Sequence, residues 1–202
     1  MVAVSKSQPP EAIRAAFAAG CRDFGENYLQ DALPKIDALS DLPITWHFIG
    51  GVQGNKARDV AARFDWVHAV DRLKIAAALA RNRPPAKAPL NACIQVNISG
   101  EANKGGIAPD DALALAREMV LLEGLRLRGL MGIASATGDP ARQRAEFALL
   151  RRVFDTLRAG GLALDTLSMG MSHDLEAALL EGATHVRVGT AIFGEREKKR
   201  AA

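Results

Sequence analysis

The chain has 202 residues, of which 49% are hydrophobic and 24% charged, and its mean hydropathy is zero. This composition is that of an ordinary globular protein, and the length suits one domain, residues 1–202, with a sizeable core. The formal net charge is +3, and residues 195–202 carry two of these charges. With so little excess charge on the remainder and no basic stripe with interleaved aromatics, we expect no nucleic-acid partner.

No apolar run approaches the length of about 18 residues that a membrane-spanning helix needs, and the start lacks the pattern of a signal peptide. We therefore expect no membrane partner. The two cysteines, Cys21 and Cys93, lie far apart in apolar surroundings. This usage is more typical of reduced, buried thiols than of a disulfide or a metal site, so we expect a cytoplasmic protein.

Short β-branched or apolar runs alternate with amphipathic segments along the chain. The predicted strands are residues 2–5, 22–27, 45–50, 66–70, 92–98, 127–134, 164–170 and 185–190. Apolar spacings of three and four predict helices over residues 10–20, 28–39, 55–64, 71–82, 109–124, 139–160 and 172–182. Glycines that favour a left-handed conformation follow several last turns, at Gly20, Gly124, Gly160 and Gly182.

Strands that alternate with helices indicate the α/β class and a parallel sheet. Eight strands are the number that closes a (β/α)₈ TIM barrel, which is the predicted fold. An open doubly wound sheet is the alternative, although no GxGxxG turn follows the first strand.

The predicted barrel has a seam, because eight strands are accompanied by only seven intervening helices. The chain begins within strand one and ends soon after strand eight. We expect the seam between these two strands to be covered by the tail AIFGEREKKR (191–200), by a helix preceding Met1, or by a partner chain.

Lys6 ends the first predicted strand, and active sites of barrels lie at the carboxyl ends of the strands. Alternation places Val2, Val4 and Lys6 on one face. If that face is the interior, the amine of Lys6 enters the mouth of the barrel. Partial desolvation there would lower its pKa and free the neutral amine for Schiff-base chemistry. The alternative is a surface lysine whose stem covers apolar atoms at the strand end.

The run HVRVGTAIFG (185–194) points to a phosphate site, because loops after strands seven and eight commonly bind phosphate in barrels. Gly189 and Thr190 would offer backbone N–H groups at a short helix start. Ser172 precedes the next-to-last helix as a predicted N-cap, and its hydroxyl could share the same phosphate. The alternative is that Ser172 only caps its helix and that Gly189 only makes a turn.

Other polar residues are candidates for the mouth. Arg187 shares its parity with Gly189 and should face inward, where a guanidinium needs a partner, either a ligand or a structural ion pair. His47 faces inward if its neighbours pack against helices, although a satisfied core histidine is the alternative. Asn27 and Asn97 are further possible donors. No P-loop and no metal-ligand spacing of histidines is found.

Several runs, taken in order over nearly the whole chain, resemble the pyridoxal phosphate (PLP) homeostasis family, the YggS/PROSC proteins. They are AVSK (3–6), DFGENY (23–28), WHFIGGVQGNK (46–56), QVNISGE (95–101), LRGLMGI (127–133), DTLSMGMS (165–172) and VRVGTAIFG (186–194). The run WHFIG-x-VQ-x-NK is particularly specific to that family.

The resemblance implies a barrel like the N-terminal domain of alanine racemase, with PLP bound as a Schiff base on Lys6. It also implies a role for each other candidate: Ser172, Gly189 and Thr190 at the phosphate, Arg187 near the pyridine nitrogen, and Asn27 and His47 beside the ring. The sequence departs from the family at two places. The family usually carries a helix before AVSK, which this sequence does not include, and it commonly has larger residues at the positions of Gly51 and Gly54.

The resemblance favours a carrier or regulator of intracellular PLP without turnover, whose partners would include PLP-dependent apo-enzymes. It also favours a monomer, while the seam would allow a dimer. A PLP-dependent amino-acid racemase is the alternative. Racemases of this kind need a second acid–base group opposite the lysine, and in them a tyrosine of an additional domain serves as that group. The sole tyrosine here, Tyr28, starts a helix, which argues against the racemase. A barrel that binds another phosphate ester without a Schiff base is the third possibility.

Overall fold

Eight parallel strands form the centre of the computed structural model, which describes residues 1–194. They are β1 (Val2–Val4), β2 (Asp23–Glu26), β3 (Thr45–Phe48), β4 (Trp66–Val70), β5 (Leu90–Val96), β6 (Leu125–Gly132), β7 (Thr166–Ser168) and β8 (Arg187–Val188). Consecutive strands from β1 to β7 pair with one another, and β8 pairs with β1.

The sheet closes on itself through its three shortest strands, β1, β7 and β8. In the pairing of β1 with β8, Val2 lies opposite Arg187 and Ala3 opposite Val188. A single parallel bridge joins Ser168 of β7 to His185, and the backbone N–H of Met169 donates to the carbonyl of His185 at 3.0 Å. The predicted (β/α)₈ barrel is therefore confirmed over the open sheet.

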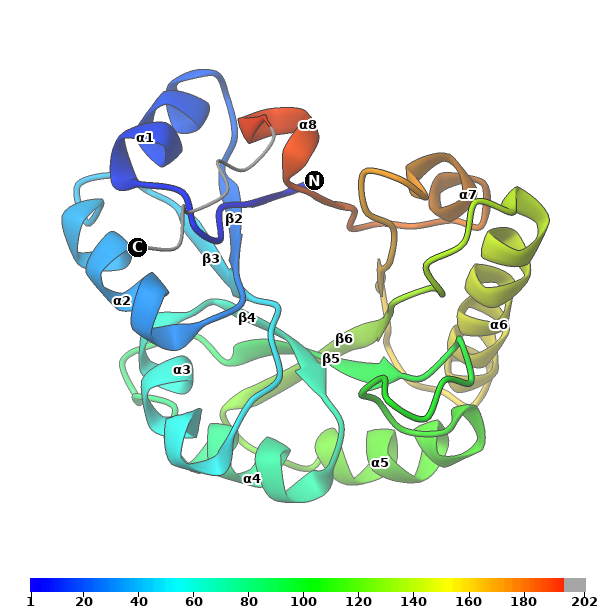
Figure 1. Cartoon of the computed structure of the whole chain (residues 1–202). Coiled ribbons are helices and arrows are strands. Elements are labelled where there is room, and N and C mark those ends of the chain that lie inside the picture. Colours follow the sequence, from blue (N-terminus) through cyan, green and yellow to red (C-terminus); the bar gives the residue numbers. More distant parts are fainter. Residues whose placement is uncertain (195–202) are drawn as a thin grey trace.

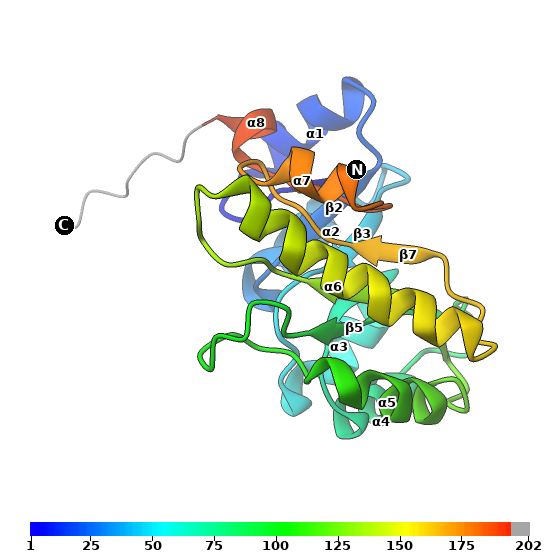
Figure 2. The same cartoon turned by 90° about the vertical axis from the view of Figure 1, so that its right-hand side faces the viewer.

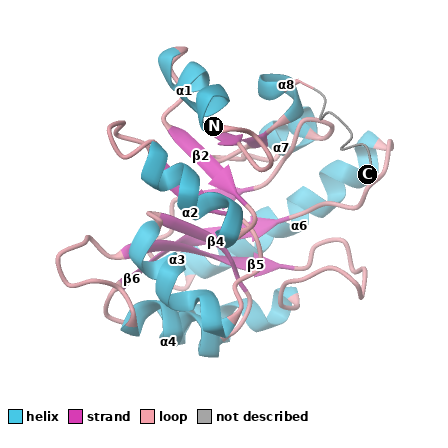
Figure 3. Ribbon diagram, turned by 60° about the vertical axis from the view of Figure 1, so that its left-hand side comes forward, coloured by secondary structure: helices cyan, strands magenta, loops and turns pink. Residues whose placement is uncertain are grey.

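Helices cover the outside of the strands (Figure 1), and Figure 3 shows the strands enclosed by them. The α-helices are α1 (Pro10–Ala18), α2 (Leu29–Ala38), α3 (Ala57–Arg63), α4 (Leu73–Arg81), α5 (Ala112–Met119), α6 (Pro140–Ala159), α7 (Leu175–Leu180) and α8 (Thr190–Phe193), with 3₁₀ turns η1 (Gly54–Lys56) and η2 (Pro109–Asp111). Figure 2 shows α6 along the outside of the molecule, between α5 and α7. Within residues 1–194, no helix is both long and apolar enough to span a bilayer.

The core lies between the strands and this outer layer of helices. Its largest fully buried side chains include Phe24 of β2, Phe48 of β3, Leu130 of β6 and Phe147 of α6. Burying side chains of this size contributes about 1.5 to 3 kcal/mol each. Phe24, Phe48 and Leu130 point outward from their strands to the helices. Because side chains alternate along a strand, the residues next to them in sequence point into the barrel.

The last part of the barrel differs from the predicted boundaries. β7 ends at Ser168 because the backbone turns at Gly170, which has φ of 91° and packs so closely that a Cβ atom there would lie 2.5 Å from Ala178. The predicted helix over 172–182 begins only at Leu175. Asp174 occupies the N-cap position, so the prediction that Ser172 caps this helix is wrong.

Two smaller predictions have different outcomes. Gly20, Gly124 and Gly182 adopt positive φ as predicted, but Gly160 has φ of −77°. Gly160 is the C-cap of α6, and the following Gly161 adopts the left-handed conformation instead, with φ of 89°. The tail 191–200 is one of the segments predicted to cover the seam. Its first part, residues 191–193, belongs to α8 and Gly194 directly follows that helix, whereas residues 195–200 lie outside the described residues.

A buried polar cluster fixes the end of β1. The Glu26 side chain is fully buried, and its Oε1 accepts hydrogen bonds from Ser5 Oγ at 2.6 Å and from Lys35 Nζ at 2.8 Å. Lys35 Nζ also donates to the backbone carbonyl of Ser5 at 2.9 Å. The cluster thus ties together β1, β2 and α2, directly beside the backbone of Lys6.

Replacing Lys35 by methionine should lower the free energy of unfolding by about 3 kcal/mol, because it leaves the Glu26 carboxylate buried without its cation. Urea denaturation measures this change. The matched control is Arg14→Ala, which breaks an exposed ion pair with Asp41 and should leave the free energy of unfolding nearly unchanged, because solvent screens that pair. Equal losses in the two variants would show that the buried cluster does not stabilise this end of the strand.

Candidate functional site

A pocket of about 290 Å³ opens at the carboxyl ends of the strands, around the junction of β1 and β8. Six of the seven predicted site residues line it: Lys6, Asn27, Ser172, Arg187, Gly189 and Thr190. The other lining residues are Val4, Gln8, Ile49, Ile133, Met171, His173 and Gly194. The pocket therefore combines an amine, a guanidinium, hydroxyl groups and an apolar wall.

Lys6 occupies a tight turn directly after β1. The backbone N–H of Gln8 donates to the carbonyl of Ser5 at 3.0 Å, which closes the turn around Lys6. Ser7 adopts φ of 65°, a left-handed conformation that costs a non-glycine residue about 1 kcal/mol. Val4 and Lys6 both line the pocket, as the alternation along β1 predicts. The half-buried Lys6 therefore enters the pocket from a backbone that the turn and the Glu26 cluster hold in place.

Arg187 forms the deep wall of the pocket and is 5% exposed. Its Nη1 donates to the carbonyl and to the Oγ of Ser168, both at 2.8 Å, and its Nη2 donates to the carbonyl of Gly132 at 3.1 Å. Burial lowers the pKa of the guanidinium to about 10, so it remains a cation at neutral pH. Among residues 1–194 it forms no ion pair, unlike the structural alternative considered from the sequence.

Two loops provide groups suited to an anion in the same pocket. Gly189 directly precedes α8, whose first turn, starting at Thr190, leaves backbone N–H groups without partners within the helix. Gly189 lies close to β1, since a Cβ atom there would lie 3.4 Å from the carbonyl oxygen of Val4. Ser172 is exposed on a turn that Asp174 closes by accepting from the backbone N–H of Met171 at 2.6 Å.

Asn27 carries the clearest sign of an absent ligand. Its Oδ1 atom is buried, and the described part of the chain offers it no hydrogen-bond partner. A buried acceptor without a donor is costly unless a bound molecule supplies one. Together with the amine of Lys6, the cation of Arg187 and the hydroxyl of Thr190, this acceptor fits an aromatic aldehyde that carries a phosphate and a donor group. PLP has this chemistry.

His47 is the predicted site residue that does not line the pocket. It lies inside the barrel, where its Nδ1 contacts His68 Nε2 at 2.9 Å and its Nε2 contacts Asp23 Oδ1 at 3.0 Å. Its ring stacks on Trp66, with centroids 5.5 Å apart and planes inclined by 10°. The structure therefore places His47 among satisfied interior residues and does not bring it beside the other six.

Other titratable groups in the interior are strongly affected by burial. Burial lowers the pKa of His47 and, further, that of His68. It also lowers the pKa of His185 to about 4 and raises that of the Cys93 thiol to about 12. These side chains are therefore uncharged at neutral pH, and Arg187 is the charged group that faces the pocket from the interior.

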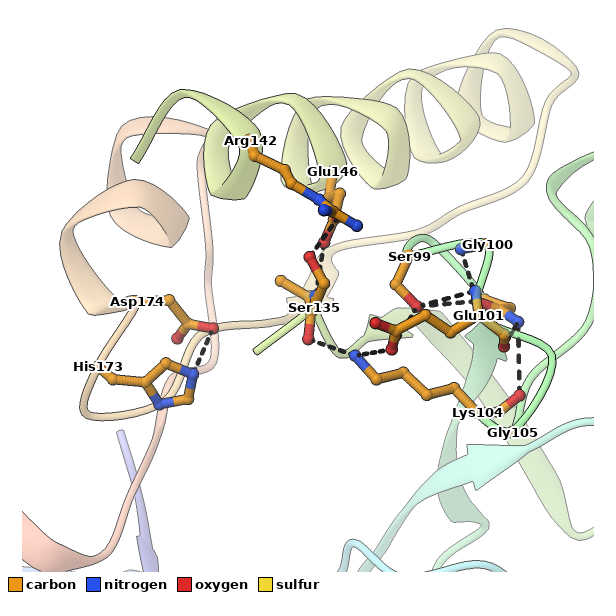
Figure 4. Close-up of polar contacts among 12 residues, drawn as sticks. Ser99, Gly100, Glu101, Lys104, Gly105, Ser135, Arg142, Glu146, His173 and Asp174 are labelled. Atoms are coloured by element: carbon orange, nitrogen blue, oxygen red, sulfur yellow. Dashed lines mark hydrogen bonds and ion pairs between the residues drawn. The ribbon is translucent and has the colours of Figure 1, made fainter. Parts of the chain in front are cut away.

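The far rim of the mouth is held by its own polar contacts (Figure 4). Lys104 Nζ donates to the carbonyl of Ala134 at 2.8 Å and pairs with Glu101 at 2.7 Å. The backbone N–H and the Oγ of Ser135 both donate to the Glu146 carboxylate at 2.6 Å. The bond from Lys104 thus joins the loop after β5 to the loop after β6, and the bonds from Ser135 join the latter to α6.

Three further residues that the sequence singled out lie outside the pocket lining. The side chain of Asn97, a candidate donor at the mouth, bonds the carbonyl of Glu101 at 2.9 Å and so shapes the loop after β5. Gly51 and Gly54 are exposed, and a Cβ atom at either would meet no atom within 4 Å. Larger residues would therefore fit at both positions without disturbing the pocket.

The interior partners of Arg187 were not predicted from the sequence. Ser168 and His68 were assigned no role, although both occupy buried strand positions and are polar. A polar residue within a buried strand is the one signal that could have identified them, because such a residue needs a partner.

Comparison with known proteins agrees with this geometry. The family model of the alanine racemase N-terminal domain matches residues 1–197. A pyridoxal phosphate homeostasis protein of Pseudomonas aeruginosa is 58% identical over 197 residues, which are 98% of this chain and 84% of that protein. The structure of PipY from Synechococcus elongatus PCC7942 without PLP aligns with a TM-score of 0.89 and 43% identity, covering 96% of this chain and 91% of that one.

The structure of PipY with PLP bound aligns with a TM-score of 0.87 and 41% identity, covering 96% of this chain and 92% of that one. The identity to these proteins extends over nearly all of the barrel that positions the pocket. The chain therefore belongs to the pyridoxal phosphate homeostasis protein family, whose barrel is that of the alanine racemase N-terminal domain.

Proposed function

We propose that residues 1–202 act as a single PLP-binding domain that holds the cofactor as a Schiff base on Lys6. In this proposal the protein serves intracellular PLP homeostasis as a carrier or regulator, without catalytic turnover. The observation that carries it is that Lys6, Arg187 and Thr190 border one pocket that also contains the unpartnered Oδ1 of Asn27. The PLP bound by PipY, a relative 41% identical to this chain, supports the choice of ligand.

Each residue has a role that follows from its chemistry. PLP, when bound, would supply an aldehyde with which a lysine amine can form a Schiff base, with loss of one water. Lys6 provides that amine from the end of β1. Ser172, Thr190 and the backbone at Gly189 bind the phosphate, and Asn27 accepts a hydrogen bond from the ring side.

The chemistry of Arg187 supports a protein that holds PLP rather than one that catalyses a reaction with it. A guanidinium only donates hydrogen bonds and keeps its protons at neutral pH, so a pyridine nitrogen facing Arg187 would accept a hydrogen bond and remain unprotonated. An unprotonated ring withdraws electrons less strongly and stabilises carbanions poorly. Three hydrogen bonds fix Arg187 at the deep wall. The pocket therefore favours storage of PLP.

The position of Tyr28 also argues against the racemase alternative. Racemisation by two bases needs a second acid–base group across the ligand from the lysine. Tyr28 is the chain's sole tyrosine, and it is 60% exposed and does not line the pocket. The names of the relatives, which are homeostasis proteins, support the same view. Absence of α-proton exchange in amino acids incubated with the loaded protein would agree with it.

The proposal extends to the setting of the protein. The partners we propose are PLP and the PLP-dependent apo-enzymes that would receive it, in the cytoplasm and as a monomer. Both cysteines, Cys21 and Cys93, are free thiols, which supports a reducing compartment.

Replacing Lys6 by alanine should abolish the covalent bond to PLP, because no other amine lines the pocket in the described residues. The measurement is borohydride reduction of the PLP-loaded protein, followed by intact mass. The control Lys74→Ala, an exposed lysine of α4, should keep the full adduct. A reducible adduct in Lys6→Ala at the level of the control would place the amine elsewhere. Near-native circular dichroism of Lys6→Ala would exclude misfolding as the cause of the loss.

Replacing Thr190 by valine should weaken binding of PLP about tenfold while leaving binding of unphosphorylated pyridoxal unchanged, because the hydroxyl serves the phosphate. Equilibrium titration of both ligands measures the two dissociation constants. Thr156→Val is the matched control, since that hydroxyl bonds the carbonyl of Arg152 on the outside of α6. Equal weakening of both ligands by Thr190→Val would contradict the assignment of the phosphate end.

A further inference from the structure

A chain of hydrogen-bonded side chains crosses the interior of the barrel from its amino-terminal end to the pocket. Asp23 Oδ1 lies 3.0 Å from His47 Nε2, and His47 Nδ1 lies 2.9 Å from His68 Nε2. His68 Nδ1 lies 2.8 Å from Ser168 Oγ, which accepts from Arg187 Nη1 at 2.8 Å. The chain begins on β2 and continues through β3 and β4, which are neighbours in Figure 1, before it reaches β7 and β8.

The hydrogen bonds of this chain can run in only one direction while both histidines are neutral. The pKa of Asp23 is lowered, first by its bond to His47, so its carboxylate is ionised and can only accept. His47 must then donate from Nε2 and accept at Nδ1. Consequently His68 donates from Nε2 and accepts at Nδ1, and Ser168 donates its hydroxyl proton to that nitrogen.

The opposite end of the chain is compatible with the same direction. Arg187 can only donate, and it donates to the Oγ of Ser168, whose proton then remains available for His68. The carboxylate of Asp23 thus sets the direction of the chain, and the guanidinium of Arg187 leaves the Ser168 proton free to follow it. An oriented chain of this kind is stronger than its separate bonds, because each bond polarises the next.

We propose that Asp23, His47, His68 and Ser168 are positioning residues that orient Arg187 and offset its charge at the deep wall of the pocket. The two histidines adopt the Nε2–H tautomer to do so. Arg187 is 5% exposed and forms no ion pair among residues 1–194. Burial lowers the pKa of Arg187, and the buried carboxylate of Asp174 partly opposes this shift without forming an ion pair with it, and the interior chain adds to this compensation. The side chain of Asp23 is 38% exposed, so the balancing negative charge remains partly in water at the other end.

The surroundings hold His47 in the orientation that this chain needs. Its ring stacks on Trp66, and the guanidinium of Arg128 lies 4.7 Å from the Trp66 ring centroid on β4. The titratable groups that act on the ring are Asp23, Asp65, His68, His185 and the amino terminus. Burial outweighs the two carboxylates, so the neutral form of His47 is favoured at neutral pH.

Protonation of His47 would reverse the chain. Both ring nitrogens of His47 would then donate, so His68 would have to accept at Nε2 and carry its proton on Nδ1. Ser168 would then accept from both His68 and Arg187, and its own proton would lose its acceptor. Acidification below the ordinary pKa of histidine, about 6.5, should therefore switch the tautomer of His68.

The test is nitrogen NMR of the four histidines in the ligand-free protein, so it does not depend on PLP binding. At neutral pH both His47 and His68 should carry their proton on Nε2 and show an unprotonated Nδ1. The exposed His173 serves as an internal reference. Protonation of either buried histidine on Nδ1 at neutral pH would overturn the proposal.

Ser168→Ala provides the matched change, because it removes the hydroxyl and leaves the backbone carbonyl that also accepts from Arg187. The Nδ1 resonance of His68 should shift on loss of its donor, and PLP binding should weaken about tenfold. His68→Gln, which retains an acceptor and a donor, should preserve PLP affinity better than His68→Phe. This part of the inference rests on the proposed function.

The outcomes separate the two proposals. Nε2–H tautomers in a protein that takes up no PLP would support the chain and contradict the proposed function. Normal PLP binding with unchanged affinity in Ser168→Ala and His68→Phe would contradict the role of the chain and leave the proposed function intact.

Discussion

The pairing of β1 with β8 is the contact on which the candidate site depends. It consists of two residue pairs, Val2 with Arg187 and Ala3 with Val188. Through it the first and the last strand of the barrel deliver Lys6, Arg187 and Thr190 to one pocket, although the sequence separates them by about 180 residues. A parallel barrel places all carboxyl strand ends at one mouth, and closure makes the two ends of the chain neighbours.

A buried cation is the second constraint. Burying the Arg187 guanidinium without a carboxylate beside it would cost several kcal/mol if nothing compensated its charge. Two carbonyls and a hydroxyl accept from it, and the interior chain ends at Asp23. The same arrangement keeps Arg187 charged and fixed in place, as the proposed role in holding PLP requires.

The sequence predicted the barrel and most of the pocket because these follow from strand order and alternation. Lys6 and Gly189 end the first and last strands, and this position alone brings them together once the sheet closes. Alternation assigns His47 to the interior but says nothing about its depth, so its distance from the pocket was not predictable. The cap of α7 was assigned to Ser172 because serine is a common N-cap, but Asp174 occupies that position.

The most direct test of the account is a crystal structure of this chain grown with PLP. The account predicts continuous density between Lys6 Nζ and the cofactor, the phosphate within hydrogen-bond distance of Thr190 and Ser172, and Arg187 facing the pyridine nitrogen with its bonds to Ser168 and Gly132 unchanged. Cofactor density elsewhere on the barrel, with the pocket between β1 and β8 occupied by water, would contradict it.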